Sequence, residues 1–460
     1  MLAGEGYNRL PVDETDAIEE DNTLQTENDE SNSDSSDDSL IDSQAPQNPI
    51  LHDKYRMIEI ISGLLGLICC IPWNIFITAT DCWKYKFRNV NDSSSGSTQL
   101  QVYFNSYLSM ANNVPNILVV LFMIFYGHKI TATIRSVTSM LIIMILMILS
   151  TVLVKVDSDN WQNAFFWIII VSVLILGLCT GILASSISGV VSSFPSNCIQ
   201  AVVLGQAIAG IFAVICQIIS LRAHADPRSS AMYYFICADM LLIIAFVAYL
   251  IARKTPYYRF YRKRGMFTLS IDNISERSIA RRSDLIAICR AIWPHLLAVF
   301  LILSITLIVY PPLLVLVAPK NKDSVIVSEE LFLPIFCFLL FNINDLLGRL
   351  IGKWFPFPQS KPIFLIILAV SRLILVFGLM VCNIHPRNHL PVLFESEYIY
   401  AILVMLLGLS NGYGLTVSMF QAPLAVKPEL QEKTGFIISA ALGLGVFSGS
   451  IASNVVLRLI

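Results

Sequence analysis

The chain has 460 residues, of which 55% are hydrophobic and only 14% are charged, and its mean hydropathy is +0.67. Because soluble domains carry about 25% charged residues, this composition excludes an ordinary soluble protein. The net charge of −2 combines a strongly acidic N-terminal segment with a more basic remainder, so it does not indicate binding to a nucleic acid polymer.

Residues 1–55 are predicted to form a disordered, acidic cytoplasmic tail. The first 50 residues hold 14 of the 33 acidic residues, in runs such as DETDAIEED and SNSDSSDDS, and such segments do not bury a core. The apolar segment of a cleaved signal peptide is not visible there. Tyr7 and Leu10 fit a tyrosine-based sorting signal of the YxxΦ form, and DDSLI (37–41) resembles an acidic dileucine signal. A chance match is the alternative.

Eleven long apolar runs follow the tail, and each is long enough, at about 19 residues or more, to cross a hydrocarbon core of ~30 Å as a helix. They lie at about 57–80, 104–126, 136–154, 162–189, 198–221, 230–252, 291–317, 331–353, 362–384, 396–418 and 434–459. The predicted fold class is an all-α polytopic membrane protein with eleven transmembrane helices, and the lipid bilayer is its surrounding partner.

Segment 253–290 carries ten Lys and Arg residues and is predicted to be a basic cytoplasmic loop, since these residues accumulate on the cytoplasmic side. The N-terminus then lies inside and the C-terminus outside. The loop separates an N-terminal six-helix bundle (56–252) from a C-terminal five-helix bundle (291–460), a 6+5 arrangement typical of transporters. It either sets topology and touches lipid headgroups or is a regulatory loop. The regulatory interpretation would place phosphorylation at Ser270, Ser275, Ser278 or Ser283.

Three further features of the sequence bear on modification, metal binding and catalysis. The sequon Asn91-Asp92-Ser93 falls in the first outer loop of this topology, where a glycan could be added. The ten cysteines show neither a paired framework nor metal-ligand spacing. No HExxH, P-loop or nucleophile-elbow motif stands in a suitable context. The sequence therefore predicts no enzyme, no cofactor and no metal site.

The first apolar run contains Pro72, Trp73 and Asn74 together at mid-membrane depth. Proline removes a backbone donor and loosens a helix, whereas tryptophan offers a flat face and an N–H group. One interpretation is a kinked helix whose Asn74 amide is satisfied by a neighbour. The other is a site wall on which a planar ring can stack.

The eighth run contains FNINDLLGR, in which Asn342, Asp345 and Arg349 form one polar stripe at helical spacing. Charges at this depth usually face a bundle interior or a watery cavity. The pair either locks helices together or binds substrate, with Asp345 accepting from hydroxyls and Arg349 donating to a carbonyl or ring nitrogen. The functional interpretation suits a neutral solute that has a planar ring and vicinal hydroxyls.

Asp239 lies in the sixth run and has no basic residue three or four positions away. It is either a structural carboxyl, protonated or facing a water-filled crevice, or a proton or cation site. Gly205 and Gly210, around Gln206 in the fifth run, are typical of close helix packing that keeps the geometry of a cavity.

Five segments in order resemble the equilibrative nucleoside transporter family (solute carrier family 29): PWNIFITAT, GQAIAGIFA, FNINDLLGR, SRLILVFGLMVCN and SNGYGL. The resemblance runs from about residue 57 to the C-terminus. It implies a fold similar to the major facilitator fold and facilitated diffusion of nucleosides, sometimes nucleobases, by alternating access.

The resemblance also implies roles for individual residues. The substrate-binding positions are Trp73, Ile77, Met123, Ala184, Asp345 and Arg349. The gate positions are Asn74, Phe338 and Asn342, and the glycines needed for a working fifth helix are Gly205 and Gly210. Ala184 is a departure, because well-known members of the family carry a base-recognising Gln there.

The predicted function is passive nucleoside transport, with purine and pyrimidine nucleosides as substrates. One alternative is a carrier for nucleobases or organic cations, proton-coupled through Asp239. Another is a receptor or scaffold that has lost transport. A multi-pass plasma membrane protein is expected, and the tail signals, which sorting adaptors would bind, also allow endosomal or lysosomal membranes.

Overall fold

The computed structural model describes residues 56–90, 98–126, 130–191, 194–223, 226–262, 279–317, 329–359, 361–384, 391–427 and 430–459. The acidic tail with Tyr7 and Leu10, the sequon residue Asn91 and the centre of the basic loop therefore lie outside the described residues. Of the serines predicted for phosphorylation, Ser270, Ser275 and Ser278 also lie outside them, whereas Ser283 lies in the helix that begins at Ile279. All these predictions remain predictions.

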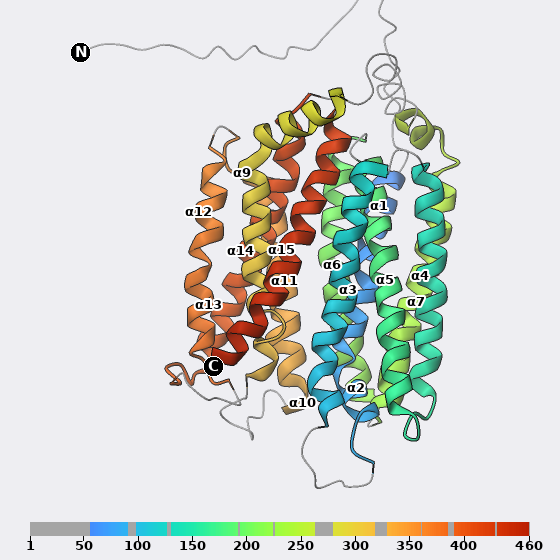
Figure 1. Cartoon of the computed structure of the whole chain (residues 1–460), viewed down its shortest axis with the longest axis vertical. Coiled ribbons are helices and arrows are strands. Elements are labelled where there is room, and N and C mark those ends of the chain that lie inside the picture. The colour runs from blue at the N-terminus through green and yellow to red at the C-terminus, as the bar shows by residue number, and fades with distance from the viewer. Residues whose placement is uncertain are drawn as a thin grey trace, which may run out of the picture. The chain divides into compact units, whose positions relative to one another are not determined.

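The described residues form a helical bundle (Figure 1). Its elements are α1 (Met57–Thr78), α2 (Thr80–Lys86), α3 (Gln99–Tyr126), α4 (Ala132–Lys155), α5 (Gln162–Val191), α6 (Ser196–Ala223), α7 (Pro227–Ala252), α9 (Ile279–Val309), η3 (Leu314–Leu316), α10 (Glu329–Phe332), η4 (Leu333–Leu339), α11 (Leu340–Trp354), α12 (Ile363–Ser371), α13 (Leu373–Met380), α14 (Glu397–Leu424) and α15 (Gln431–Leu459). A helix satisfies its backbone groups internally, which lipid requires of any spanning segment.

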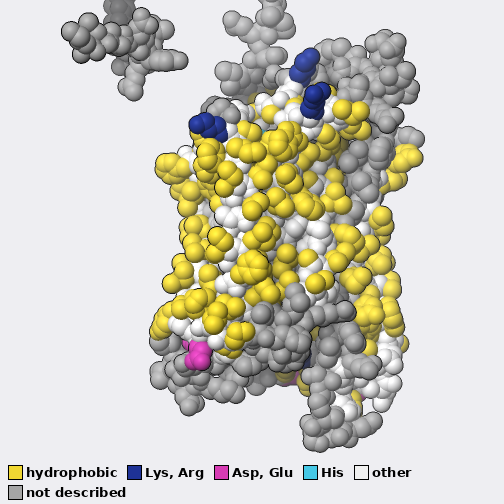
Figure 2. All heavy atoms as spheres, turned by 60° about the vertical axis from the view of Figure 1, so that its left-hand side comes forward, with side chains coloured by type: hydrophobic (Ala, Val, Ile, Leu, Met, Phe, Trp, Pro, Cys, Tyr) yellow, Lys and Arg dark blue, Asp and Glu magenta, His cyan; other side chains and the backbone are white. Residues whose placement is uncertain are grey.

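Ten helices within the described ranges are long and apolar enough to cross a membrane. The second predicted span, 104–126, coincides with α3, and the count of eleven stays a prediction. Apolar side chains cover the middle of the face drawn in Figure 2, while Lys and Arg side chains gather at one end. On α12 and α13 the exposed side chains include Ile374 at 73% and Phe377 at 66%. Such a surface is suited to lipid.

The helices pack in two groups. In the first, α1 packs on α6 and α7, and α5 packs on α3 and α4; in the second, α9 packs on α15, α14 and α12, and α11 packs on α14. The groups meet where α6 contacts η4, α11 and α14, and where α15 contacts α3 and α5. These contacts fit the predicted two-bundle arrangement.

Three predicted spans differ in detail from the helices observed. The eighth span contains a π-helix, η4, which begins beside Pro334, since proline disrupts regular helical bonding. The ninth span is two helices joined at Arg372. The seventh begins at Ile279 and not near residue 291, because Ala, Arg and Leu in that stretch favour helix beyond the membrane.

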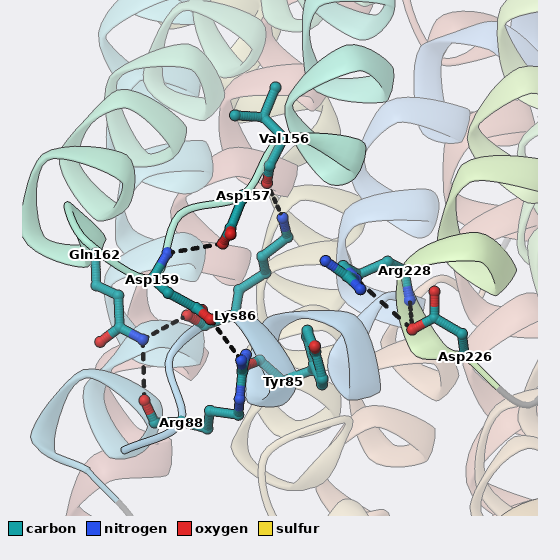
Figure 3. A network of polar contacts seen from close by, with 9 residues as sticks. All are labelled: Tyr85, Lys86, Arg88, Val156, Asp157, Asp159, Gln162, Asp226 and Arg228. Atoms are coloured by element: carbon teal, nitrogen blue, oxygen red, sulfur yellow. Dashed lines mark hydrogen bonds and ion pairs between the residues drawn. The ribbon is translucent and has the colours of Figure 1, made fainter. Parts of the chain in front are cut away.

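A polar network ties α2 to the turn between α4 and α5 at the predicted outer end of the bundle (Figure 3). The Arg88 guanidinium lies 4.0 Å from the centre of the Tyr85 ring and donates to Asp159 Oδ2 at 2.7 Å. The buried Lys86 ammonium donates to the carbonyl of Val156, which caps the end of α4. These contacts hold the outer end of the first helical group together.

Candidate substrate-binding site

The centre of the candidate site is an ion pair on α11. Arg349 Nε donates to Asp345 Oδ2 at 2.8 Å, and the two side chains are 10% and 5% exposed. One helical turn separates the residues, so both project from the same face of α11. The i, i+4 spacing predicts this contact, and the structure contains it.

The second carboxylate oxygen of Asp345 is bonded to a different helix. Asn411 of α14 donates from Nδ2 to Asp345 Oδ1 at 2.7 Å, and Thr306 of α9 donates to Asn411 Oδ1 at 2.8 Å. All three side chains are buried. The carboxylate is therefore held on both oxygens by groups from α11, α14 and α9.

Arg349 also connects the two groups of helices. Its Nη1 donates to the backbone carbonyl of Val203 on α6 at 2.7 Å. Within the described part of the chain, Nη2 of Arg349 has no hydrogen-bond partner, and each Asp345 oxygen keeps a further lone pair. The pair therefore retains one donor group and acceptor capacity for a neutral polar ligand.

Glycines allow α11 and α14 to approach closely behind this pair. A Cβ atom added to Gly348 would lie 2.1 Å from the carbonyl oxygen of Leu409, and one added to Gly412 would lie 1.9 Å from that of Asp345. Only glycine leaves room for backbones at this separation. The short distance between the helices is what lets Asn411 reach Asp345.

The predicted gate residues of η4 and α11 lie against α6. Asn342 donates to the carbonyl of Phe338 at 2.8 Å and to the hydroxyl of Tyr310 at 3.3 Å. A Cβ added to Gly210 of α6 would lie 2.0 Å from Asn342 Oδ1. Val214 of α6 belongs to the same buried apolar cluster as Phe338. The two helical groups are thus in direct contact at this level.

The predicted wall on α1 lies on the first helical group. Trp73, Asn74 and Ile77 are half-buried, and Asn74 donates to the carbonyl of Cys70 at 2.9 Å within its own helix. Gly66 of α1 packs against Val202 of α6, the neighbour of the Val203 whose carbonyl accepts from Arg349. α1 therefore packs on the part of α6 that contacts the ion pair.

The predicted packing glycine Gly205 lies where α6 crosses α1. A Cβ added to it would lie 2.0 Å from the carbonyl oxygen of Gly63, and one added to Gly66 would meet the carbonyl oxygen of Val202 at the same distance. Close packing of α1 on α6 is therefore the role that the geometry gives to Gly205.

Three predicted residues form their contacts elsewhere in the described part of the chain. Ala184 of α5 is half-buried against the apolar cluster of the first group. Met123 of α3 is buried and its sulfur accepts from Arg135 at 3.7 Å. Asp239 of α7 accepts from Thr151 of α4 at 2.7 Å, and α4 and α7 lie on the side of the molecule away from α11 (Figure 1).

Sequence reasoning assigned no role to Asn411, Thr306, Tyr310 or the Val203 carbonyl. Asn411 belongs to the SNGYGL segment and stands among apolar residues, so its polarity at membrane depth was a signal that could have singled it out. Thr306 and Val203 carry no such signal, because a threonine can bond its own helix and every residue has a carbonyl.

Comparison with solved structures identifies the fold of this protein. The chain matches the proton:xylose symporter XylE of the major facilitator superfamily over 87% of its length and 88% of that chain, with a TM-score of 0.56 and 14% sequence identity. It matches the nucleoside transporter NupG over 86% of its length and 91% of that chain, with a TM-score of 0.50 and 13% identity. The fold is that of major facilitator transporters.

The chain belongs to the nucleoside transporter family, whose profile matches residues 170–458. It is 31% identical to equilibrative nucleoside transporter 3 of Rattus norvegicus, over 89% of this chain and 90% of that protein. It is 28% identical to equilibrative nucleoside transporter 1 of Homo sapiens, over 87% of this chain and 97% of that protein. The family predicted from the five sequence segments is therefore confirmed.

Proposed function

We propose that this multi-pass membrane protein is a passive carrier of nucleosides, with no covalent chemistry, cofactor or metal in its cycle. The observation that carries the proposal is the buried Asp345–Arg349 pair, which keeps both acceptor and donor capacity. A neutral solute can use both, because its hydroxyls donate to a carboxylate and its carbonyl or ring nitrogen accepts from a guanidinium. A nucleoside carries those groups on one small molecule.

Pairing of the two charges also stabilises the site when no substrate is bound. A single buried charge is costly, whereas a paired and hydrogen-bonded one is tolerated. In the proposed cycle the sugar hydroxyls lie against Asp345 and the base lies between Arg349 and Trp73. Ala184, which lacks a polar side chain, would leave the base less strictly selected, so both purine and pyrimidine nucleosides are proposed as substrates.

Alternating access is supported by contacts that cross between the helical groups. Arg349 bonds the Val203 carbonyl, and Asn342 abuts Gly210. Rocking of one group against the other would break and remake such contacts. In this proposal Asn74, Phe338 and Asn342 serve as gate residues on the predicted outer side.

A second candidate is a proton-coupled carrier of nucleobases or organic cations. The observation behind it is Asp239, whose Oδ1 is buried without a hydrogen-bond partner among the described residues. Its place between α4 and α7 separates it from the Asp345–Arg349 pair (Figure 1). The passive nucleoside carrier is therefore preferred.

The test is uptake of labelled uridine and adenosine into proteoliposomes whose inside and outside pH are set independently. We expect uptake to reach equilibrium without a proton gradient and to collapse in Arg349→Ala. Arg290→Ala, at an exposed position of α9, is the matched control and should transport normally. Uptake only with acid on one side would favour the proton-coupled candidate, and normal uptake in Arg349→Ala would exclude the proposed site.

We propose the subcellular location of the protein from a sequence pattern in its N-terminal tail. The YxxΦ pattern at Tyr7 and Leu10 would bind sorting adaptors and direct part of the protein to endosomal or lysosomal membranes, with the plasma membrane as the default. Tyr7→Ala should increase the fraction accessible to surface biotinylation, while Gln25→Ala, at a tail residue outside the pattern, should leave it unchanged. The same surface fraction in both variants would exclude the signal.

A further inference from the structure

Arg372, at the junction of α12 and α13, is an arginine with an unusual environment. It is 1% exposed, and its guanidinium donates to four neutral acceptors: Ser410 Oγ at 3.0 Å, the Ile302 carbonyl at 2.7 Å, Thr306 Oγ1 at 2.6 Å and the Leu407 carbonyl at 3.2 Å. No carboxylate contacts it in the described ranges. A buried charge without a counter-ion is costly, so its retention points to a role.

The direction of the hydrogen bonds suggests that role. A guanidinium has only donors, so the Thr306 hydroxyl accepts from Arg372 and directs its own hydrogen elsewhere. Asn411 Oδ1 lies 2.8 Å away and accepts it, while the Ile302 carbonyl, also within reach, already accepts from Arg372 Nη1. With its oxygen so engaged, Asn411 turns its NH₂ group to Asp345 Oδ1 at 2.7 Å.

The bonds therefore run in one direction from Arg372 through Thr306 and Asn411 to Asp345. We infer that Arg372 and Thr306 are positioning residues: this relay orients the Asn411 amide, which fixes the plane of the Asp345 carboxylate for substrate. The inference deepens the proposed function and rests on it. Without the relay the Asn411 amide could turn over, presenting an oxygen to the carboxylate in place of a donor.

The two arginines are connected to Asp345 by different routes. Arg349 lies on α11 itself, whereas Arg372 acts through α9 and α14. Asp345 is thus held directly by one arginine and, through Asn411 and Thr306, by a second. A carboxylate held in this way can accept hydrogen bonds from both vicinal hydroxyls of a ribose.

The test compares uptake of uridine with uptake of 2′,3′-dideoxyuridine, which lacks the vicinal hydroxyls. Wild type is expected to prefer uridine, and Asp345→Asn is expected to lose that preference. Thr306→Val removes the relay hydroxyl at nearly constant shape and should raise the KM for uridine about tenfold while leaving that for the dideoxy analogue unchanged. Thr306→Ser keeps a hydroxyl and should restore the preference.

Ser410→Ala is the matched control. Ser410 accepts from Arg372 but does not lie between Arg372 and Asp345, so its removal should leave the preference for uridine as in wild type. If Thr306→Val does not fold, Thr306→Ala replaces it, because it deletes the same hydroxyl without adding a methyl group at a new position.

The outcomes separate the relay from the proposed function. Unchanged preference in Thr306→Val, or an equal loss of uptake for both compounds, would overturn the relay and leave the carrier intact. Wild type that transports both compounds equally would remove the role of Asp345 in binding hydroxyls, and the relay with it. Wild type that transports neither would overturn the proposed function itself.

Discussion

Gly210 of α6 has only a hydrogen atom as its side chain, and this allows α6 to lie close to Asn342 of α11. A Cβ there would lie 2.0 Å from Asn342 Oδ1, and Asn342 is held by bonds to Phe338 and Tyr310. Gly210→Ala should therefore strain this contact by about 1–3 kcal/mol and slow nucleoside uptake about tenfold.

The control for this substitution is Gly435→Ala on α15, where nothing lies within 4 Å of the added atom. Its uptake should match wild type. Adding Asn342→Ala to Gly210→Ala removes the atoms that clash and should recover part of the lost rate. Wild-type uptake in Gly210→Ala alone would show that the contact does not limit transport.

Asp226 is the carboxylate whose pH dependence can be stated from its contacts. It caps α7 by accepting from the backbone amides of Arg228 and Ser229 and from the Ser229 hydroxyl. Desolvation raises the pKa of Asp226, but these hydrogen bonds outweigh it and lower the pKa below its ordinary value. The carboxylate therefore stays ionised in mild acid.

A carboxyl group with a lowered pKa contributes stability that is present above its unfolded pKa of about 3.9 and lost as pH falls through the folded value. The difference in unfolding temperature between wild type and Asp226→Ala should thus stay constant between about pH 7.5 and 5 and shrink only below about pH 4. Thermal unfolding in detergent measures it. A difference that fades between pH 7 and 5 would contradict the assignment.

At the scale of elements, the contact between α11 and α14 depends on glycine. A Cβ on Gly412 would lie 1.9 Å from the carbonyl oxygen of Asp345 and 2.9 Å from the amide nitrogen of Arg349. Both are backbone atoms and cannot turn aside. Gly412→Ala should lower the free energy of unfolding by about 1–3 kcal/mol, seen as a lower unfolding temperature in detergent.

Gly378→Ala on α13 is the comparison for Gly412→Ala. Its nearest new neighbour is the Leu403 side chain at 3.2 Å, which can shift by a few tenths of an ångström. We expect a smaller loss of stability there. Equal unfolding temperatures for the two variants would mean that α11 and α14 can separate at little cost.

The positions of the helices could be predicted from sequence, whereas their irregularities could not. Length and hydropathy alone decide whether a segment can span lipid, so the apolar runs match the observed helices closely. Such runs carry no information on hydrogen-bond register, and for that reason the π-helix η4 and the break at Arg372 were not predicted. Pro334 was the one local signal for η4.

The residues of the candidate site could likewise be predicted only in part from the sequence. Asp345 and Arg349 could be paired from sequence because their spacing lies within one helix. Asn411 and Thr306 reach Asp345 from two other helices, and helical periodicity does not say which helices adjoin. The resemblance to the nucleoside transporter family supplied the order of the motifs, but not the hydrogen bonds between them.

At the scale of the whole molecule, alternating access requires that the contact between α6 and α11 open during each cycle. A Cβ on Gly210 would lie 2.5 Å from Asn342 Cγ, and a carbon–carbon bond is about 1.5 Å long. The two Cβ atoms would thus be at most about 4 Å apart, within the range that a disulfide bond spans. Gly210→Cys combined with Asn342→Cys should therefore crosslink the two helical groups.

Oxidation of this double variant in proteoliposomes should abolish uridine uptake, and reduction should restore the rate of the unoxidised sample, because the crosslink holds the groups in one of their two arrangements. Mass spectrometry of the linked peptides distinguishes this disulfide from pairs formed by the native cysteines. Each single substitution, treated with the same oxidant, reports the effect of oxidation alone. Transport by fully crosslinked protein would mean that α6 and α11 remain together throughout the cycle, and movement would then have to be sought at the contact of α15 with α3.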